Sequence, residues 1–206
     1  MTASRRYRLL PMKSTSVQIF DQRTRSFLSA ELLEDPGDDY VETVDAFWSV
    51  YKRRALRRRR AAGKPVPEHS HWNWKLKLEH ERFENSLYKC FAFVCNEPQG
   101  LMMLKYGSKF LCRYTGQQGK PLVYIAYVES APWNVKEYED TVRYSGIGKE
   151  FYKAAVRFSR LLGFAGRVGL HSLPSAEVFY ANSCQMVPLG RDPGCEDLVY
   201  FESVSQ

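Results

Sequence analysis

The chain has 206 residues and a mass of 23.9 kDa, enough for one domain with a sizeable core. Hydrophobic residues make up 44% of it and the net charge is +7; this composition indicates a folded protein whose partners are acidic, such as nucleotides, nucleic acid or an anionic cofactor. No apolar run approaches the roughly 20 residues that span a bilayer, and the first ten residues lack the apolar core of a secretory signal. We therefore expect a cytoplasmic protein without a membrane segment.

The cysteines and histidines predict neither disulfides nor a metal site. The five cysteines are an odd number without a C-x-x-C pair, so we expect reduced thiols. His69 and His71 have no Cys or carboxylate partner at metal-ligand spacing, and His171 lies on a predicted strand, where we expect a structural role. The five cysteines are Cys90, Cys95, Cys112, Cys184 and Cys195.

The first third of the chain predicts two short strands and two helices. The strands are Arg6–Met12 and Ser16–Phe20, and an acidic loop follows them. Apolar residues then recur at helical spacing, and this helix runs into an arginine-rich stretch and ends near Gly63. A second helix is expected over His69–Glu84. The apolar face of the first helix consists of Val44, Phe47, Trp48, Tyr51 and Ala55.

The remainder predicts strands alternating with helices. Leu87–Cys95 and Leu101–Tyr106 are predicted to form a hairpin. Phe110–Tyr114 is predicted to be a further strand, either separate or a continuation of the second strand of the hairpin. Pro121–Ser130 is the clearest strand, because its middle is almost wholly apolar and suits a strand buried on both faces. The later elements are a helix from Ser145 to Gly163, a strand over Arg167–Leu173, a helix over Ser175–Met186 and a strand over Asp197–Glu202.

The most informative motif is a glycine turn between the buried strand and the amphipathic helix. It reads Arg143-Tyr144-Ser145-Gly146-Ile147-Gly148, an R-x-x-G-x-G pattern. A helix start leaves backbone N–H groups unpaired and carries a partial positive charge, and glycine lets a ligand come close to that backbone. The turn therefore predicts a site for a phosphate-bearing ligand.

Two other glycine motifs do not fit this turn. A P-loop needs a glycine where Arg143 stands, and a Ser or Thr where Glu150 stands. A dinucleotide fingerprint needs a third glycine, and that position is Phe151. The residues at these positions therefore exclude both a P-loop and a dinucleotide-binding loop.

The order of these elements resembles the GCN5-related N-acetyltransferases. The resemblance rests on a hairpin, a buried strand, the R-x-x-G-x-G turn, a helix, a strand, a helix with Phe179-Tyr180 and a last strand. It implies an α/β fold (α+β by stricter counting) with a central mixed twisted sheet flanked by helices. We expect residues 1–206 to form one domain, in which 1–86 with its two helices lies on the acceptor side and 87–202 forms the acetyl-CoA-binding core.

The resemblance implies acetyl-CoA as the acetyl donor, with no metal. Backbone N–H groups of the turn would hold the pyrophosphate, and the pantetheine arm would follow the preceding strand. Two departures are visible: 131–142 is longer than the family's usual connection, and Cys184-Gln185-Met186 stands where the family usually has Gly-Phe. The expected cofactor-binding residues are Val128, Ser130, Arg143, Tyr144, Ser145, Gly146, Ile147, Gly148 and Lys149.

The resemblance also places two catalytic candidates. Tyr180 would protonate the departing CoA thiolate, unless it is simply a core aromatic next to Phe179. Glu129 would accept the amine proton if partial burial raises its pKa, unless it is a solvated carboxylate at the strand end. A backbone N–H near Ser130 is the natural oxyanion donor. Cys184 has no evident His partner, so we expect direct attack of the amine without an acyl-enzyme.

The acceptor is less well indicated. Arg53–Arg60 and the aromatic stretch 71–75 suit RNA through phosphate contacts and stacking, but a basic helix end with core tryptophans is the simpler interpretation. Because the family's first two helices usually wall the acceptor site, we expect Trp72, Trp74 and Trp133 to shape that pocket.

The sequence thus predicts an acetyl-CoA-dependent N-acetyltransferase that acts on a primary amine. Three alternatives stay open: a toxin-like acetyltransferase acting on aminoacyl-tRNA, a non-catalytic acyl-CoA-binding protein, and a nucleic-acid-binding protein that uses the arginine helix. The sequence does not choose among acceptor amines, between acetyl and longer acyl groups, or between a monomer and a homodimer.

Overall fold

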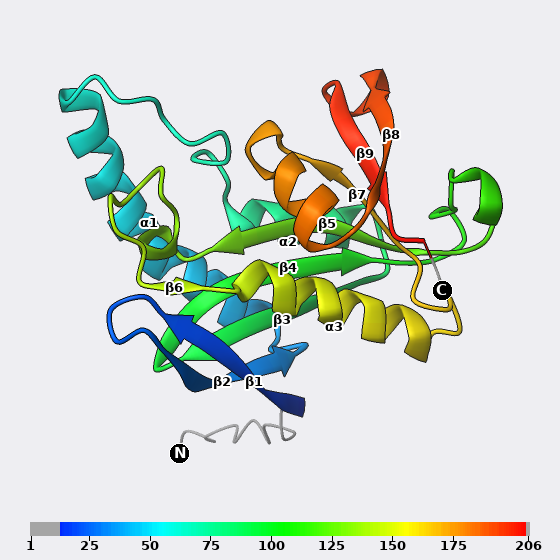
Figure 1. The fold of residues 1–206 in the computed structure, drawn as a ribbon, viewed down its shortest axis with the longest axis horizontal. Coiled ribbons are helices and arrows are strands. Elements are labelled where there is room, and N and C mark those ends of the chain that lie inside the picture. The colour runs from blue at the N-terminus through cyan, green and yellow to red at the C-terminus, as the bar shows by residue number, and fades with distance from the viewer. Residues whose placement is uncertain (1–12, 205–206) are drawn as a thin grey trace, which may run out of the picture.

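A computed structural model describes residues 13–204 of the chain. Within them, nine strands form one mixed sheet, with α1 (Asp38–Ala61) and α2 (Trp74–Phe83) on one face and α3 (Ile147–Leu161) on the other (Figure 1). The strand order is β6-β1-β2-β3-β4-β5-β7-β9-β8. The strands are β1 (Lys13–Asp21), β2 (Ser26–Glu34), β3 (Tyr88–Cys95), β4 (Glu97–Lys105), β5 (Val123–Ser130), β6 (Tyr144–Ser145), β7 (Val168–Ser172), β8 (Val187–Asp192) and β9 (Leu198–Glu202).

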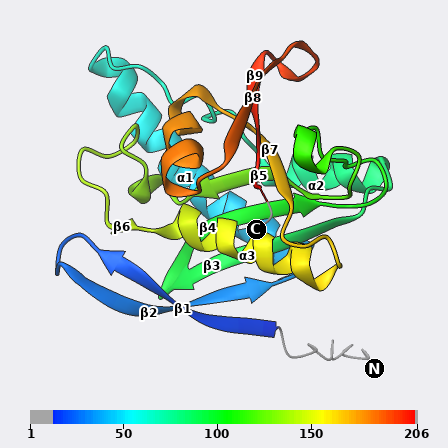
Figure 2. The same cartoon turned by 45° about the vertical axis from the view of Figure 1, so that its right-hand side comes forward.

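Strands β5 and β7 separate in the middle of the sheet. All neighbouring strands are antiparallel except β5 and β7, whose parallel pairing consists of Val123 with Val168 and Tyr124 with Gly169. Beyond these two pairs β5 stays with β4, while β7 pairs with β9. Figure 2 shows β8 and β9 rising from the end of the sheet opposite β1 and β2. Within residues 13–204, this separation leaves the edge of β5 beyond Tyr124 without a strand partner.

An extra residue in β5 lies next to the parting. Met103 of β4 pairs with Tyr127, and the next residue, Leu104, pairs with Ile125, so Ala126 is a bulge. A bulge bends its strand and increases the local twist. It therefore helps to turn the second half of β5 away from β7.

Each face of the sheet has its own apolar core. Under α3, Phe151 and Ala154 pack with residues of β3, β4 and β5, and under α1 and α2 the fully buried Trp48, Trp74 and Leu78 pack on the opposite face. Two separate cores explain why β5 is apolar along most of its length.

The long helices and the strands near the glycine turn are confirmed as predicted, with shifts at their ends. Ser16–Phe20 lies inside β1, while Arg6–Met12 lies outside the described residues. The second helix begins at Trp74 and not at His69, because the Asn73 side chain caps it by accepting a hydrogen bond from Leu76 N at 2.8 Å. Among residues 13–204, no helix combines the length and apolarity that a membrane crossing needs.

Other predicted elements differ from the structure. The strand predicted over Phe110–Tyr114 is wrong, because this segment forms only one isolated bridge, between Leu111 and Pro121. The helix predicted over Ser175–Met186 is confirmed in a shorter form: residues 174–183 are helical, beginning as a 3₁₀ turn, Pro174–Ala176, and ending as a short π-helix, Phe179–Ser183. The strands β2, β6 and β8 were not predicted from the sequence.

We predict that Gly100→Ala destabilises the fold by about 1–3 kcal/mol, the usual cost of overpacking. A Cβ on Gly100 of β4 would lie 2.7 Å from both Ile147 Cγ2 and Phe151 Cε2, so α3 would have to move off the sheet. Chemical unfolding measures the change. Gly116→Ala is the control, since Gly116 lies in the short 3₁₀ turn Thr115–Gln117 and its Cβ would lie 3.3 Å from the nearest atom, in the Tyr114 ring. Equal stability of the two variants would contradict the close contact between α3 and β4.

Candidate active site

The glycine turn presents free backbone amides at the start of α3. Gly146 adopts a φ of 98°, which favours glycine, and precedes the first helical residue. The first hydrogen bond of the helix runs from Glu150 N to Gly146 O at 3.2 Å, so it uses none of the amides of residues 147–149. Within residues 13–204, no side chain caps this helix start. The turn therefore has three N–H groups and the positive end of the helix dipole available for an anion.

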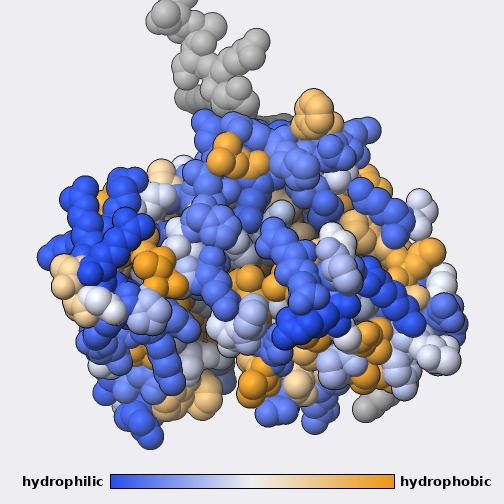
Figure 3. Space-filling view, turned by 90° about the horizontal axis from the view of Figure 1, so that it is seen from above, coloured by the Kyte–Doolittle hydropathy of each residue, from blue (hydrophilic) through white to orange (hydrophobic). Residues whose placement is uncertain are grey.

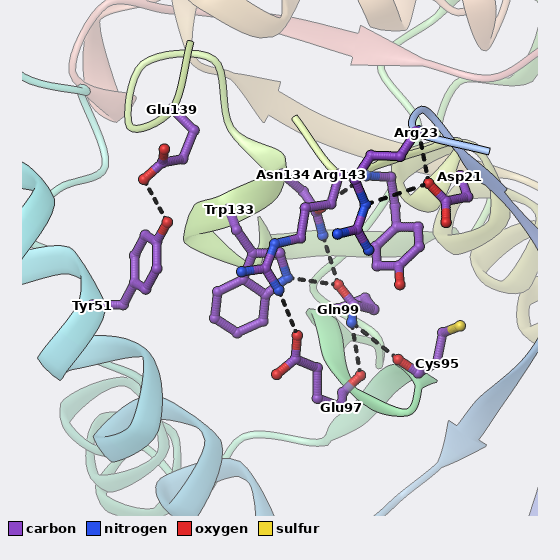
Figure 4. A network of polar contacts seen from close by, with 11 residues as sticks. Asp21, Arg23, Tyr51, Cys95, Glu97, Gln99, Trp133, Asn134, Glu139 and Arg143 are labelled. Carbon is purple, nitrogen blue, oxygen red and sulfur yellow. Dashed lines mark hydrogen bonds and ion pairs between the residues drawn. The ribbon is translucent and has the colours of Figure 1, made fainter. Parts of the chain in front are cut away.

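A buried glutamine fixes the segment that leads into the turn (Figure 4). Gln99 of β4 is fully buried, and its Oε1 accepts hydrogen bonds from Trp133 Nε1 and from Asn134 Nδ2, both at 2.8 Å. Asn134 Oδ1 in turn accepts from Tyr144 N at 3.0 Å. This chain of hydrogen bonds sets the position of the turn relative to β4.

The residues before Gly146 face the strands and not the helix start. Arg143 Nη1 lies 3.1 Å from Glu97 Oε1, and its guanidinium lies 5.3 Å from the centre of the Trp133 ring (Figure 4). Ser145 Oγ accepts a hydrogen bond from Gln22 Nε2 at 2.8 Å. Tyr144 is buried and belongs to β6, which pairs with β1. These three predicted cofactor-binding residues therefore hold the turn in place, while the amides of residues 147–149 remain free.

Gly148 allows the next helical segment to pack on the turn. A Cβ at this position would lie 3.0 Å from Phe179 Cζ. The Phe179 ring also contacts Tyr180, at 5.1 Å between centroids, and the Tyr180 ring lies 6.2 Å from that of Phe201. Burial raises the pKa of the Tyr180 phenol, so the phenol is protonated at neutral pH and is a weaker acid than an exposed tyrosine. The second glycine of the motif thus brings Tyr180 near the helix start.

A narrow cavity of about 60 Å³ lies where β5 and β7 part. The unpaired edge of β5 beyond Tyr124 faces it, and an unpaired strand edge offers backbone N–H and C=O groups to a ligand. The predicted residues Val128 and Tyr180 both lie on its wall. The cavity is lined by residues 125–128, residues 170–173, Trp72, Ala176 and Tyr180.

Glu129 does not face this cavity. Its side chain is fully buried on the α1 side of the sheet, ion-paired with Lys52 and accepting a hydrogen bond from Trp74 Nε1 at 2.7 Å. Burial raises the pKa of this carboxyl, and Lys52 and Trp74 oppose the rise. A carboxylate that accepts from two donors and is closed off from solvent does not suit the predicted role of general base. Its position suits a structural role, in which it links β5 to α1 through Lys52.

An aromatic wall stands on the α2 side of the cavity. The Lys77 ammonium lies 3.5 Å from the centre of the Tyr127 ring and 4.3 Å from that of the Trp72 ring, and both rings line the cavity. Burial lowers the pKa of Lys77 to about 8. Of the three tryptophans predicted to shape an acceptor pocket, only Trp72 lines the cavity, whereas Trp74 and Trp133 are buried in the core.

Hydrogen-bonded polar side chains link β5, β7 and β8 next to the cavity. The Tyr124 hydroxyl lies 2.8 Å from His171 Nδ1, and His171 Nε2 lies 2.9 Å from Asp192 Oδ2. Arg113 Nη1 donates to the same Asp192 oxygen at 2.6 Å. His171, for which the sequence predicted a structural role, lines the cavity. Its two partners, Tyr124 and Asp192, are far from it in the sequence.

The long segment 131–142 is tied to α1. The Tyr51 hydroxyl donates to Glu139, and Arg58 Nη2 donates to the same oxygen at 2.6 Å. Lys64 and Asp140 add an exposed ion pair at 3.3 Å. In this arrangement the segment forms a wall joined to the first helix.

Comparison with known proteins shows the fold. No family model and no curated protein sequence matches the chain. A structure described as histone acetyltransferase HPA2 and related acetyltransferase, from Corynebacterium glutamicum, is similar with a TM-score of 0.51 and 14% identity, over 85% of this chain and 96% of that one. A GNAT-family acetyltransferase from Listeria monocytogenes has a TM-score of 0.47 and 9% identity, over 84% and 94%. The first likeness, with the parted sheet, shows the fold that the sequence resemblance implied: that of the GCN5-related N-acetyltransferases.

We predict that Lys52→Met destabilises the protein by about 3–5 kcal/mol at neutral pH, because it leaves the Glu129 carboxylate buried and unpaired. The loss should be larger at about pH 8 than at about pH 5, since burial raises the Glu129 pKa and a protonated carboxyl removes the uncompensated charge. Denaturant unfolding at both pH values measures it. Lys64→Met, which breaks an exposed pair, should cost less than about 1 kcal/mol. A loss that is equal at both pH values would contradict a buried charge.

Proposed function

We propose that the protein is an acetyl-CoA-dependent N-acetyltransferase that moves an acetyl group to a primary amine by direct attack. Two observations carry this proposal: the free amides of residues 147–149 at the start of α3, and the edge of β5 beyond Tyr124, which has no strand partner within residues 13–204. An acyl-CoA needs both features: amides for its diphosphate, and a strand edge that can hydrogen-bond its pantetheine amides. In this proposal 87–202 is the donor-binding core, and 1–86 supplies the acceptor side of one domain.

The residues present can account for each chemical step. The amine nitrogen attacks the thioester carbonyl, a C–N bond forms, and the C–S bond breaks to release the CoA thiolate. A backbone N–H on the open edge of β5, near Ser130, would bind the oxyanion. The attacking nitrogen would release a proton to solvent as the amide forms. Tyr180, on the cavity wall, would give its proton to the thiolate and regain one from solvent.

The aromatic wall removes the need for a dedicated base. Burial lowers the pKa of Lys77 to about 8 beside Trp72 and Tyr127. An acceptor amine that enters next to the same rings would lose solvation in the same way, and it would lose its proton more readily than in water. Glu129 then acts by holding α1 against β5 through Lys52.

A second candidate function follows from the C-terminal half of α1. Arg53, Arg54, Arg57 and Arg60 are exposed, and no ion pair to them occurs within residues 13–204. Figure 3 shows hydrophilic side chains gathering at this end of the molecule. Such a surface suits RNA phosphates, so an aminoacyl-tRNA could be the amine acceptor. Loss of RNA retention when the four arginines are replaced with Ala, with CoA binding kept, would favour this acceptor.

We predict that CoA and acetyl-CoA bind with measurable heat in calorimetry, and that Gly148→Ala weakens binding about tenfold, or about 1.4 kcal/mol. The added Cβ would push against Phe179 and disturb the amides next to it. Lys153→Gln is the control, since Lys153 lies one turn later and pairs with Glu150. No heat with the folded wild-type protein would contradict acyl-CoA binding in any form.

We predict that Tyr180→Phe lowers acetyl transfer by at least about tenfold while leaving the affinity for CoA unchanged, because it removes the proton donor and keeps the ring. Thiol release from acetyl-CoA is followed with a panel of polyamines, amino acids and aminoacyl-tRNA. Binding without turnover on any acceptor would favour the non-catalytic alternative. Unchanged turnover in the variant would remove the acid role.

A further inference from the structure

Three side chains with different metal-binding atoms meet at the far end of the sheet. His171 lies on β7, Asp192 ends β8, and Cys195 ends the short turn Pro193–Cys195 that follows. Their ligand atoms all lie within 4.8 Å of one another, and each residue is partly buried. The acyl-transfer chemistry proposed above uses none of them.

The three ligand atoms are close enough to bind one ion after small movements. Zinc binds His nitrogen, carboxylate oxygen and Cys sulfur at roughly 2.0–2.3 Å, usually in a tetrahedron. His171 Nε2 and Asp192 Oδ2 are already 2.9 Å apart, so an ion could enter between them with a small movement. The Cys195 sulfur would be the third ligand, and a water the fourth.

The neighbours of the histidine and the carboxylate orient them as outer partners do in metal sites. The Tyr124 hydroxyl holds His171 Nδ1, which leaves Nε2 turned toward Asp192. The other Asp192 oxygen, Oδ1, accepts from Gly194 N at 3.0 Å. Both ligands are thus fixed before any ion arrives.

One neighbour opposes a cation. Arg113 Nη1 lies 2.6 Å from Asp192 Oδ2, and the guanidinium lies 4.2 Å from the centre of the Tyr200 ring. Its side chain is 52% exposed, so it can move toward solvent. Its charge should weaken the binding of a divalent ion without preventing it.

We propose that His171, Asp192 and Cys195 bind a zinc ion. Binding would release the thiol proton of Cys195 and replace the direct His171–Asp192 hydrogen bond with two bonds to the metal. The ion would join the β8–β9 turn to β7, on the strand that lines the cavity. This proposal stands apart from acetyl transfer, because it needs only these three side chains and their partners.

The test is metal titration of the full-length reduced protein. Zinc is titrated against a chromophoric chelator, and cobalt is used as a spectroscopic probe. We expect one bound ion, a cobalt–thiolate charge-transfer band in the near ultraviolet, and a higher melting temperature with zinc. Cys195→Ser should abolish the band, and Tyr124→Phe should weaken zinc by about 10- to 100-fold, as loss of an outer partner does.

Three further variants separate this site from adventitious binding. His171→Ala should reduce zinc affinity more than Tyr124→Phe does, whereas His80→Ala, at an exposed position on α2, should have no effect. Arg113→Gln should tighten zinc binding, because it removes the competing charge. A cobalt band that persists in Cys195→Ser, or zinc affinity that is unchanged in folded His171→Ala, would overturn the proposal.

Discussion

The arrangement of the whole site depends on the early separation of β5 from β7. Two parallel strands that share only two residue pairs leave most of an inner edge unpaired, and backbone groups on such an edge need a partner or solvent. The bulge at Ala126 and the pairing of β7 with β9 keep the two halves of the sheet apart. The cavity and Tyr180 lie at that opening. Phe179, the neighbour of Tyr180, packs on the start of α3 at Gly148.

Two rigid supports keep the opening in place. Gln99, Trp133 and Asn134 fix the approach to the glycine turn through hydrogen bonds within the core. On the same face of the sheet as Trp133, the buried pair of Lys52 and Glu129 joins α1 to β5. A buried ion pair is costly to desolvate, so its presence is weak evidence for stability. Removing one partner is nevertheless strongly destabilising, because the other charge stays buried without compensation. We infer that this ion pair positions α1 relative to β5 and the cavity beside it.

The sequence predicted the features that depend on local order. Neighbouring residues alone determine three such features: the apolar run of β5, the amphipathic pattern of α3 and the glycine turn. All three occur in the structure at the predicted positions. β2 was missed because its second half, Ala30–Glu34, is rich in helix-forming residues, and pairing with β1 and β3 decides its conformation. The two-residue β6 has no pattern of its own and forms only through β1.

Contacts between residues far apart in the chain could not be predicted from the sequence. Nothing near Glu129 in the sequence indicates Lys52, so the sequence predicted either a general base or a solvated carboxylate at a position where the structure has a buried ion pair. The need for Gly148 comes partly from the Phe179 ring, which a different segment supplies. His171 likewise meets Asp192 only because β7 and β8 both border β9.

The most direct measurement is an NMR spectrum of the protein labelled with ¹⁵N only at its 13 glycines, recorded as CoA is added. If the helix start holds a diphosphate, the amide signals of Gly146 and Gly148 should move, and those of Gly63 and Gly119, which lie in turns far along the chain from the site, should stay. Movement elsewhere with Gly146 and Gly148 unchanged would contradict the account.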